Sequence, residues 1–285
     1  MRVLILGGDG MLGHRLLRQL RVRHEVKVTL HQELPAYARF ELFTAANVFA
    51  GVDVRDSDQL AQVLAAFPPH AIVNCVGIVK QRAEAGEAIP SLQINSLLPH
   101  RLAQLARVVG ARLVHLSTDC VFAGTRGDYR EDDPADPQDL YGRSKLLGEV
   151  SEPPCLTLRT SMIGPELIRK RGLLEWFLAQ RGGAVKGFTR AIFSGFTTAE
   201  LSRVIERLLT DHPAASGLYH VSSEPISKHD LLRRIDAALG LQVRIAPDDG
   251  FHCDRSLNSE RFRAAFGYSP PSWDQMVAEL AREIT

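Results

Sequence analysis

The sequence predicts an α/β protein with a doubly wound parallel sheet and a smaller C-terminal lobe. Three observations support this prediction. Short apolar segments alternate with stretches whose apolar residues recur at helical spacing, as in βαβ units. A glycine-rich turn directly follows the first apolar segment, where a strand would pass into a helix. The chain has 285 residues, 45% of them hydrophobic and 24% charged, which is enough for one large core and a second lobe.

The first half contains the predicted sheet. We expect strands over 2–6, 24–29, 49–54, 71–76 and 112–116. Apolar residues at helical spacing follow the first of these strands and precede the fifth, so we expect helices there. Strands that alternate with helices imply a parallel sheet with right-handed crossovers, and because the strands are parallel their carboxyl ends meet at one edge of the sheet.

The second half is less regular. After Pro153 and Pro154 we expect a strand over 155–159, and then a loop over 166–190, rich in glycine and basic residues, around one helix at 173–180. The remaining expected elements are a capped helix from Thr197, a strand at 218–221, a helix from Ser227 to Leu239, a strand at 242–245 and a helix from Ser272.

Composition excludes several classes of protein. Thirty-four Lys and Arg against 33 Asp and Glu leave a net charge of +1, so no overall field attracts nucleic acid or anionic lipid. The four cysteines form no CxxC pair, which argues against a metal site or a disulfide framework and suits a reducing compartment. No apolar segment is long enough to span a membrane, and the start lacks a signal-peptide pattern. We therefore expect a cytoplasmic protein that binds neither nucleic acid nor membrane and holds no metal.

The segment GGDGMLG at 7–13 predicts a phosphate-binding turn. Gly7 permits the tight turn, Gly10 lets the main chain approach a diphosphate, and Gly13 allows close packing of helix on strand. Met11 and Leu12 lie at the helix N-terminus, whose unpaired N–H groups attract phosphate. We therefore expect a dinucleotide here, and a tight turn without a ligand is the alternative.

The second strand bears on which dinucleotide is bound. Residues 28–32, VTLHQ, contain no carboxylate to hold the adenosine ribose, which favours NADP(H). We expect Arg39 to be a surface residue rather than a partner of a 2′-phosphate. Asp53 and Val54, at the predicted end of the third strand, are placed to meet the adenine. A solvated aspartate is the alternative for Asp53.

A second group of residues predicts proton chemistry. Tyr141 and Lys145 are four residues apart, so on a helix they share one face. A free phenol has a pKa of about 10, and a nearby cation lowers that pKa. Ser117 and Thr118 end a buried strand at the sheet edge where ligands bind, and a hydroxyl there would hydrogen-bond a substrate carbonyl while the tyrosine exchanges a proton with it. By alternation we expect His115 to face away from this hydroxyl pair as a packed histidine.

Together these motifs resemble those of the extended short-chain dehydrogenase/reductases, in particular the dTDP-4-dehydrorhamnose reductases and related nucleotide-sugar 4-ketoreductases. The matching segments are GGDGMLG at 7–13, STDCVFAG at 117–124, YGRSK at 141–145, LRTS at 158–161 and RSLNSERF at 255–262. The resemblance implies a Rossmann domain over 1–163, to which 197–223 returns, and a substrate-binding lobe over 164–285.

The resemblance also implies the roles of residues. Thr118, Tyr141 and Lys145 would be the catalytic triad, NADPH or NADH the hydride donor, and a 4-keto deoxysugar linked to dTDP or UDP the substrate. The implied coenzyme contacts are Gly7, Gly10, Met11, Leu12, Gly13, Asp53, Val54, Cys75, Val76, Gly77, Asn95, Ser117, Tyr141, Lys145 and Thr160. The implied substrate contacts are Thr118, Asp119, Tyr141 and Arg255. For Asn95, which the family uses to support the lysine, the alternative is an ordinary polar residue on a helix surface.

Other side chains have less specific expectations. Basic residues crowd 169–190 as candidates for the substrate diphosphate, with solvated loop charge as the alternative: Arg169, Lys170, Arg171, Arg181, Lys186 and Arg190. Five aromatic residues are expected in the core or the wall of a pocket: Trp176, Phe177, Phe188, Phe193 and Phe196. His14, just after the glycines, is expected to face solvent, with an approach to a phosphate as the alternative.

Departures from the family keep alternatives open. Cys120 stands where the family has an aromatic residue, Ser256 follows Arg255 where the family has a proline, and 77–82 differs too, so the exact sugar stays open. A dehydratase needs a second acid directly after Asp119, which Cys120 does not supply. A nucleotide-sugar epimerase of the same fold, and a non-catalytic NADP-binding regulatory subunit like that of methionine adenosyltransferase, remain alternatives. The oligomeric state is open, a homodimer included.

Overall fold

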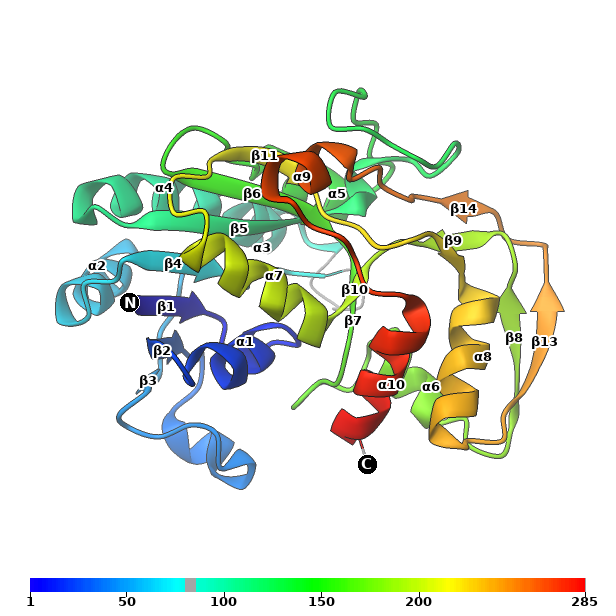
Figure 1. Cartoon of the computed structure of the whole chain (residues 1–285). Coiled ribbons are helices and arrows are strands. Elements are labelled where there is room, and N and C mark those ends of the chain that lie inside the picture. Colours follow the sequence, from blue (N-terminus) through cyan, green and yellow to red (C-terminus); the bar gives the residue numbers. More distant parts are fainter. Residues whose placement is uncertain (80–85, 285) are drawn as a thin grey trace. The chain divides into compact units, whose positions relative to one another are not determined.

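The computed structural model describes residues 1–79 and 86–284 and divides into two compact units (Figure 1). The first unit comprises Met1–Ser117, Asp139–Leu158 and Ser202–Leu218. The second unit comprises Thr118–Gln138, Arg159–Leu201 and Tyr219–Thr285. The segment Thr118–Gln138 therefore belongs to the second unit, whereas the sequence pattern groups it with the first.

A seven-stranded sheet dominates the first unit, in the order β11-β6-β5-β4-β1-β2-β3. Its strands are β1 Arg2–Leu6, β2 Glu25–Thr29, β3 Val48–Phe49, β4 Ala71–Asn74, β5 Arg112–Thr118, β6 Cys155–Thr160 and β11 Gly217–His220. Strand β1 pairs in parallel with β2 on one side and with β4 on the other, so the strand order reverses there. The predicted doubly wound parallel sheet is confirmed, although the third strand ends at Phe49 and not at Val54.

Helices cover both faces of this sheet, which explains why its central strands are buried along their length. The helices are α1 Gly13–Leu20, α2 Ser57–Ala66, α4 Leu98–Val109 and α7 Thr198–Thr210, with the 3₁₀ helix η1 Leu34–Phe40 after β2. Apolar residues of α2 and α4 form one core with those of β1, β4 and β5. Helix α2 has no counterpart in the predicted elements, and the Asp56 carboxylate caps it by accepting the N–H groups of Asp58 and Gln59.

Two helical segments pack closely beside the carboxyl end of β5. The chain enters α4 through α3 Ala88–Ser91 and the π-helix η3 Leu92–Leu97, and η3 packs against α5 Leu140–Leu147. A Cβ atom on Gly148, directly after α5, would lie only 1.9 Å from the main-chain oxygen of Asn95. The absence of a side chain at Gly148 therefore lets α5 approach η3.

The second unit is a mixture of short sheets and helices. Its helices are η4 Asp119–Val121, α6 Leu173–Leu178, α8 Lys228–Leu239, α9 Glu260–Phe266 and α10 Trp273–Ile284. Its strands are β7 Met162–Ile163, β8 Ala184–Phe188, β9 Ala191–Phe193, β10 Phe196–Thr197, β12 Ile226–Ser227, β13 Arg244–Asp248 and β14 Cys253–Asp254. The Ser227 hydroxyl caps α8, as predicted, and α8 packs against β8, β13 and α10 (Figure 1). The prediction of a loop over 166–190 is wrong at Ala184–Phe188, because β8 pairs there with β13.

In the part of the chain that the structure describes, no helix is long and apolar enough to cross a lipid bilayer.

Candidate functional site

The glycine turn has the geometry expected of a phosphate-binding loop. Gly7 has a φ of +80°, a conformation that L side chains rarely adopt, and its N–H donates to the Thr29 hydroxyl at 3.2 Å. A Cβ atom on Gly13 would lie 2.0 Å from the Gly7 oxygen, so this contact between helix and turn requires glycine. The N-cap residue of α1, Leu12, makes no side-chain hydrogen bond to cap the helix. The residues present therefore fit a dinucleotide diphosphate.

Two side chains brace this turn from inside the protein. The prediction that His14 faces solvent is wrong, because His14 is buried and its Nδ1 lies 2.8 Å from the Gly10 oxygen. On the other side of the turn, the Tyr37 hydroxyl donates to the Asp9 carboxylate at 3.3 Å. These contacts limit the movement of the loop that would hold the diphosphate.

The expected adenine contacts lie in a loop. The prediction of a strand that ends at Val54 is wrong. Strand β3 ends at Phe49, and Asp53 and Val54 follow it. The Asp53 carboxylate accepts from the Arg55 guanidinium at 2.6 Å, which lowers the pKa of Asp53. Asp53 is therefore an ion-paired aspartate rather than merely a solvated one. Arg39 is exposed, as expected, with its guanidinium 4.7 Å from the centre of the Phe40 ring.

Lys145 is a buried ionisable side chain beside the carboxyl end of β5. It lies on α5, one turn after Tyr141, and the Asp139 carboxylate caps that helix. Only 5% of Lys145 is exposed, and its Nζ donates to the Leu116 oxygen at 2.5 Å. Burial lowers the pKa of Lys145 to about 8, although Glu149 and Cys75 act in the opposite direction. Lys145 thus carries a charge at neutral pH that it gives up readily.

His115 lies beside this lysine. It is completely buried, as the expectation of a packed histidine requires, and its Nε2 is 3.5 Å from Lys145 Nζ. Its Nδ1 is 3.1 Å from Nδ2 of Asn74. The expectation that His115 faces away from the hydroxyl pair is wrong for Ser117, because residues 115 and 117 share one face of β5, where Ser117 donates to Glu149 at 2.6 Å.

Asn95 connects two parts of the site. Its side chain is 1% exposed, so the alternative of a surface residue is wrong. Its Oδ1 accepts the N–H of Ile78 at 2.9 Å, while its Nδ2 lies 2.9 Å from the Ile78 oxygen and 3.1 Å from the Ser144 hydroxyl. Asn95 therefore fixes the segment after β4 to the helix that carries Tyr141 and Lys145.

The segment Cys75, Val76 and Gly77 follows β4 next to the glycine turn. The N–H of Cys75 donates to the Leu6 oxygen at 3.1 Å, which continues the pairing with β1. A Cβ atom on Gly7 would touch Val76 at 3.0 Å. Burial raises the pKa of the Cys75 thiol to about 12, so this cysteine stays a neutral thiol.

In the second unit, Thr118 and Arg255 organise one segment of main chain. The Thr118 hydroxyl accepts the N–H of Cys120 at 3.1 Å and donates to the Asp119 carboxylate at 3.2 Å, so it caps η4. Arg255 donates from Nε to the Phe122 oxygen at 2.7 Å and from Nη2 to the Ala123 oxygen at 3.1 Å. Arg255 thus holds the chain directly after the predicted catalytic hydroxyl.

A buried polar pair in the second unit is absent from the predicted site. Arg159 Nη1 lies 3.2 Å from His220 Nε2, and His220 Nδ1 lies 2.9 Å from the Tyr129 oxygen. Burial and the Arg159 charge lower the pKa of His220 to about 4, so His220 is neutral. The LRTS motif points to Arg159, but no local signal points to His220. Thr160, next along the chain, is buried and donates to the Ser161 oxygen.

The basic and aromatic residues of the second unit differ in their surroundings. Lys170 pairs with Glu175 at 2.8 Å and Lys186 with Asp248 at 3.0 Å, so both charges are compensated within the protein. Phe177 and Phe196 are fully buried, as expected, but Trp176 is 42% exposed and the expectation of a core position is wrong for it. Residues 80–82, part of the departure at 77–82, lie outside the described residues.

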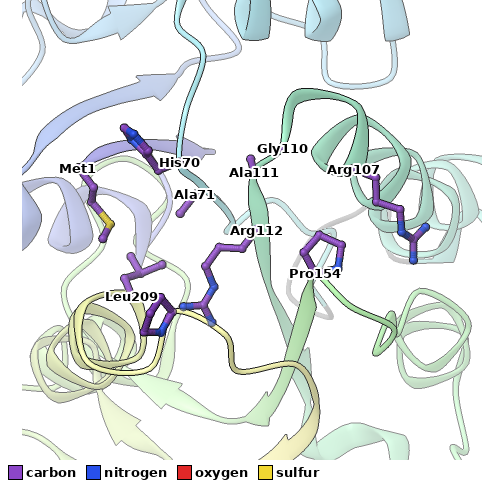
Figure 2. Close-up of a pocket in the computed structure, with 10 residues that line it drawn as sticks. Met1, His70, Ala71, Arg107, Gly110, Ala111, Arg112, Pro154 and Leu209 are labelled. Carbon is purple, nitrogen blue, oxygen red and sulfur yellow. The ribbon is translucent and has the colours of Figure 1, made fainter.

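A cavity of about 590 Å³ lies at the opposite, amino edge of the sheet in the first unit (Figure 2). Arg112 points toward Leu209 there, and its guanidinium donates to the oxygens of Leu208, His212 and Ala215 at 2.6, 3.1 and 3.2 Å. These bonds satisfy carbonyl groups at and beyond the end of α7. Arg112 is therefore engaged within the protein, and the cavity is remote from the carboxyl ends of the strands, beside which Lys145 lies.

Among the described residues, no group of three or more His, Cys, Asp or Glu side chains could hold a metal ion. The chain is 32% identical over 152 residues to subunit beta of methionine adenosyltransferase 2 from Bos taurus, an alignment that covers 52% of this chain and only 41% of that relative. It is 26% identical over 310 residues to dTDP-4-dehydrorhamnose reductase from Aggregatibacter actinomycetemcomitans, covering 98% of both chains.

A solved structure of dTDP-4-dehydrorhamnose reductase from Bacillus anthracis, in complex with NADP, superposes with a TM-score of 0.79 at 23% identity and covers 100% of this chain and 99% of that one. This likeness confirms the Rossmann-type fold. The family described as RmlD substrate binding domain matches residues 1–285, which include both units. The chain as a whole therefore belongs to the RmlD substrate binding domain family.

Proposed function

We propose that this protein uses NADPH to reduce the 4-keto group of a nucleotide-linked deoxysugar. The observation that carries the proposal is the placement of Lys145: it is buried, bound to the Leu116 oxygen at the carboxyl end of β5, and one helical turn from Tyr141. Burying a lysine in that position is costly for folding, which favours a functional role for its charge. It is suited to lowering the pKa of a neighbouring phenol.

The coenzyme proposal rests on the glycine turn. Gly7, Gly10 and Gly13 leave room for a diphosphate at the uncapped start of α1. The coenzyme, when bound, supplies the hydride. NADPH is favoured over NADH because residues 28–32, at the end of β2, include no carboxylate to repel a 2′-phosphate, and because the Bacillus anthracis structure contains NADP.

The remaining roles follow from the chain's own groups. We assign Tyr141 as the proton donor to the carbonyl oxygen, Thr118 as a hydrogen-bond donor that orients that oxygen, and Lys145 as the cation that stabilises the phenolate and holds the nicotinamide ribose. Arg255 and Asp119 are proposed to act on the sugar nucleotide. The bond from Arg255 to the Phe122 oxygen and the bond from the Thr118 hydroxyl to Asp119 support this proposal.

The nucleotide proposed for the substrate is dTDP, because the full-length relative from Aggregatibacter actinomycetemcomitans carries that substrate in its name. UDP is the alternative to be tested beside it. We propose a cytoplasmic location, which suits the four free cysteines, and a homodimer, to be tested by the molar mass in solution.

A second candidate is a non-catalytic regulatory subunit that binds NADP. The match to half of this chain in methionine adenosyltransferase 2 subunit beta favours it. The presence of both Tyr141 and Lys145 favours an enzyme, because a binding subunit has no need of a proton donor.

The discriminating experiment mixes the purified chain with NADPH and a freshly generated 4-keto-6-deoxy sugar linked to dTDP, and in parallel to UDP. Consumption of NADPH, followed at the nicotinamide absorbance, with a reduced sugar nucleotide identified by NMR, supports the reductase. Tight NADPH binding without turnover on either sugar nucleotide would support the regulatory subunit instead.

A further inference from the structure

His115 is a buried titratable side chain to which the proposed reaction gives no role. It lies between two polar partners, with Asn74 on its Nδ1 and Lys145 on its Nε2, at 3.1 and 3.5 Å. Asn74 is 1% exposed and His115 is 0% exposed, so no solvent competes for these contacts. Three buried polar groups therefore form one row across the ends of β4 and β5.

The main chain determines the orientation of this row. The N–H of Val76 donates to Oδ1 of Asn74 at 3.1 Å. Because a backbone N–H can only donate, the Asn74 amide must turn its oxygen toward Val76 and its Nδ2 toward His115. The reverse orientation would place two donors against each other at Val76.

The Asn74 amide in turn determines the tautomer of His115. Since Nδ2 of Asn74 has only hydrogens to offer, Nδ1 of His115 must accept. Burial and the Lys145 charge hold the pKa of His115 well below its ordinary value, so the ring is neutral and carries one hydrogen. That hydrogen lies on Nε2, which faces Lys145 Nζ.

The Nε2–H group of His115 interacts differently with the two protonation states of the Lys145 side chain. An ammonium has no lone pair to accept from Nε2–H, and the positive end of that dipole opposes its charge. A neutral amine accepts from Nε2–H and still donates to the Leu116 oxygen at 2.5 Å. The geometry of the row therefore favours the amine.

We propose that His115 is a positioning residue, held by Asn74 with its hydrogen on Nε2, that fixes the Lys145 amine beside Leu116 and favours its release of a proton. The consequence for catalysis rests on the proposed reductase function. Lys145 is then an ammonium that gives up its proton easily to the phenolate that Tyr141 becomes.

Other titratable groups near this row stay unchanged in the test. Glu149 and Cys75 act on Lys145, and His100 acts on His115. Cys75 is a neutral thiol, with a pKa of about 12. Tyr141 lies one turn before Lys145 on α5. A substitution at Asn74 therefore changes the pKa of Lys145 either through the His115 ring or directly through space.

The first experiment is a nitrogen NMR spectrum of the full chain without coenzyme or substrate. The His115 signals, assigned by their loss in His115→Phe, are expected to show a protonated Nε2 and an unprotonated Nδ1 at neutral pH. A hydrogen on Nδ1, or on both nitrogens, overturns the proposal. This readout does not depend on reductase activity, so it decides the question even if the proposed reaction fails.

The second experiment measures the pH at which the rate of a single turnover falls on the alkaline side. In Asn74→Asp the new carboxylate accepts a hydrogen bond from Nδ1 of His115, so the hydrogen of the ring moves to Nδ1. Nε2 then accepts from the Lys145 ammonium, which raises the pH at which the rate falls by about one unit. In the His115→Phe background the new carboxylate acts on Lys145 only through space. We therefore expect the shift in the pH of the rate decrease to be smaller by at least about half a unit. Equal shifts in both backgrounds would overturn the role of His115.

Discussion

Gly10→Ala is expected to separate coenzyme binding from folding. Gly10 has no positive φ, and an added Cβ would meet its nearest atom, the Gly7 oxygen, at 3.3 Å, a tight contact that a small adjustment relieves. The free energy of unfolding is therefore expected to change by less than about 1 kcal/mol. The added methyl group would, however, stand where the diphosphate must approach the main chain.

The size of the binding defect follows from the contacts at risk. If the methyl group displaces the diphosphate from one charge-assisted hydrogen bond, the loss is about 1.5–3 kcal/mol. That loss corresponds to a rise of roughly 10- to 150-fold in the dissociation constant of NADPH. The assay is a fluorescence titration with NADPH beside chemical unfolding of the same preparation.

Two further glycines make the comparison sharp. Gly13→Ala places a Cβ 2.0 Å from the Gly7 oxygen, which the structure cannot absorb, so we expect a loss of about 1–3 kcal/mol of stability together with the loss of binding. Gly86→Ala meets nothing within 4 Å and is the neutral control. Native affinity for NADPH in Gly10→Ala, or native stability in Gly13→Ala, would refute the assigned geometry of the turn.

Three other predictions concern Lys145, Arg255 and Gly148. The pKa of Lys145 is about 8 in the folded protein and ordinarily 10.5, so between these pH values the unfolded chain binds more protons than the folded one. The free energy of unfolding should therefore rise by up to about 3 kcal/mol from pH 8 to 10.5. The Lys145→Met variant should abolish this rise. Arg255→Met removes both bonds to the segment after Thr118, so steady-state kinetics should show a raised KM for the sugar nucleotide with unchanged NADPH affinity; an unchanged KM would contradict this role. Gly148→Ala drives a Cβ to 1.9 Å from the Asn95 oxygen and should lower kcat at least about tenfold by displacing α5, whereas native kcat would show that the packing of α5 on η3 is unimportant.

Local patterns predicted the elements whose environment is set by near neighbours in the chain. The first strand, the glycine turn and α1 are contiguous, so apolar spacing and three glycines were sufficient to predict this strand–turn–helix unit. Helix α2 was also within reach, because Asp56 and Gln59 have the spacing of a helix cap. Strand β8 was not, since its sequence, AVKGF, is weakly apolar and it exists by pairing with β13 some sixty residues later.

The candidate site shows the same division. The spacing of Tyr141 and Lys145 predicted their common helix face, which is a local property. The contacts of Lys145 with His115 and Leu116 depend on how α5 packs beside β5, and no sequence pattern encodes them. His14 was misjudged for a related reason: its ring bonds the Gly10 oxygen, a partner that gives a polar side chain cause to be buried.

The central claim, that Tyr141 donates the proton for a carbonyl reduction, is tested most directly by Tyr141→Phe. Turnover of NADPH with the 4-keto sugar nucleotide is measured beside NADPH affinity. We predict unchanged affinity and a rate lower by about 10²- to 10⁴-fold, because the phenylalanine keeps the ring and removes only the donor. A variant that turns over at the native rate would contradict the assignment of Tyr141 and the proposed reaction with it.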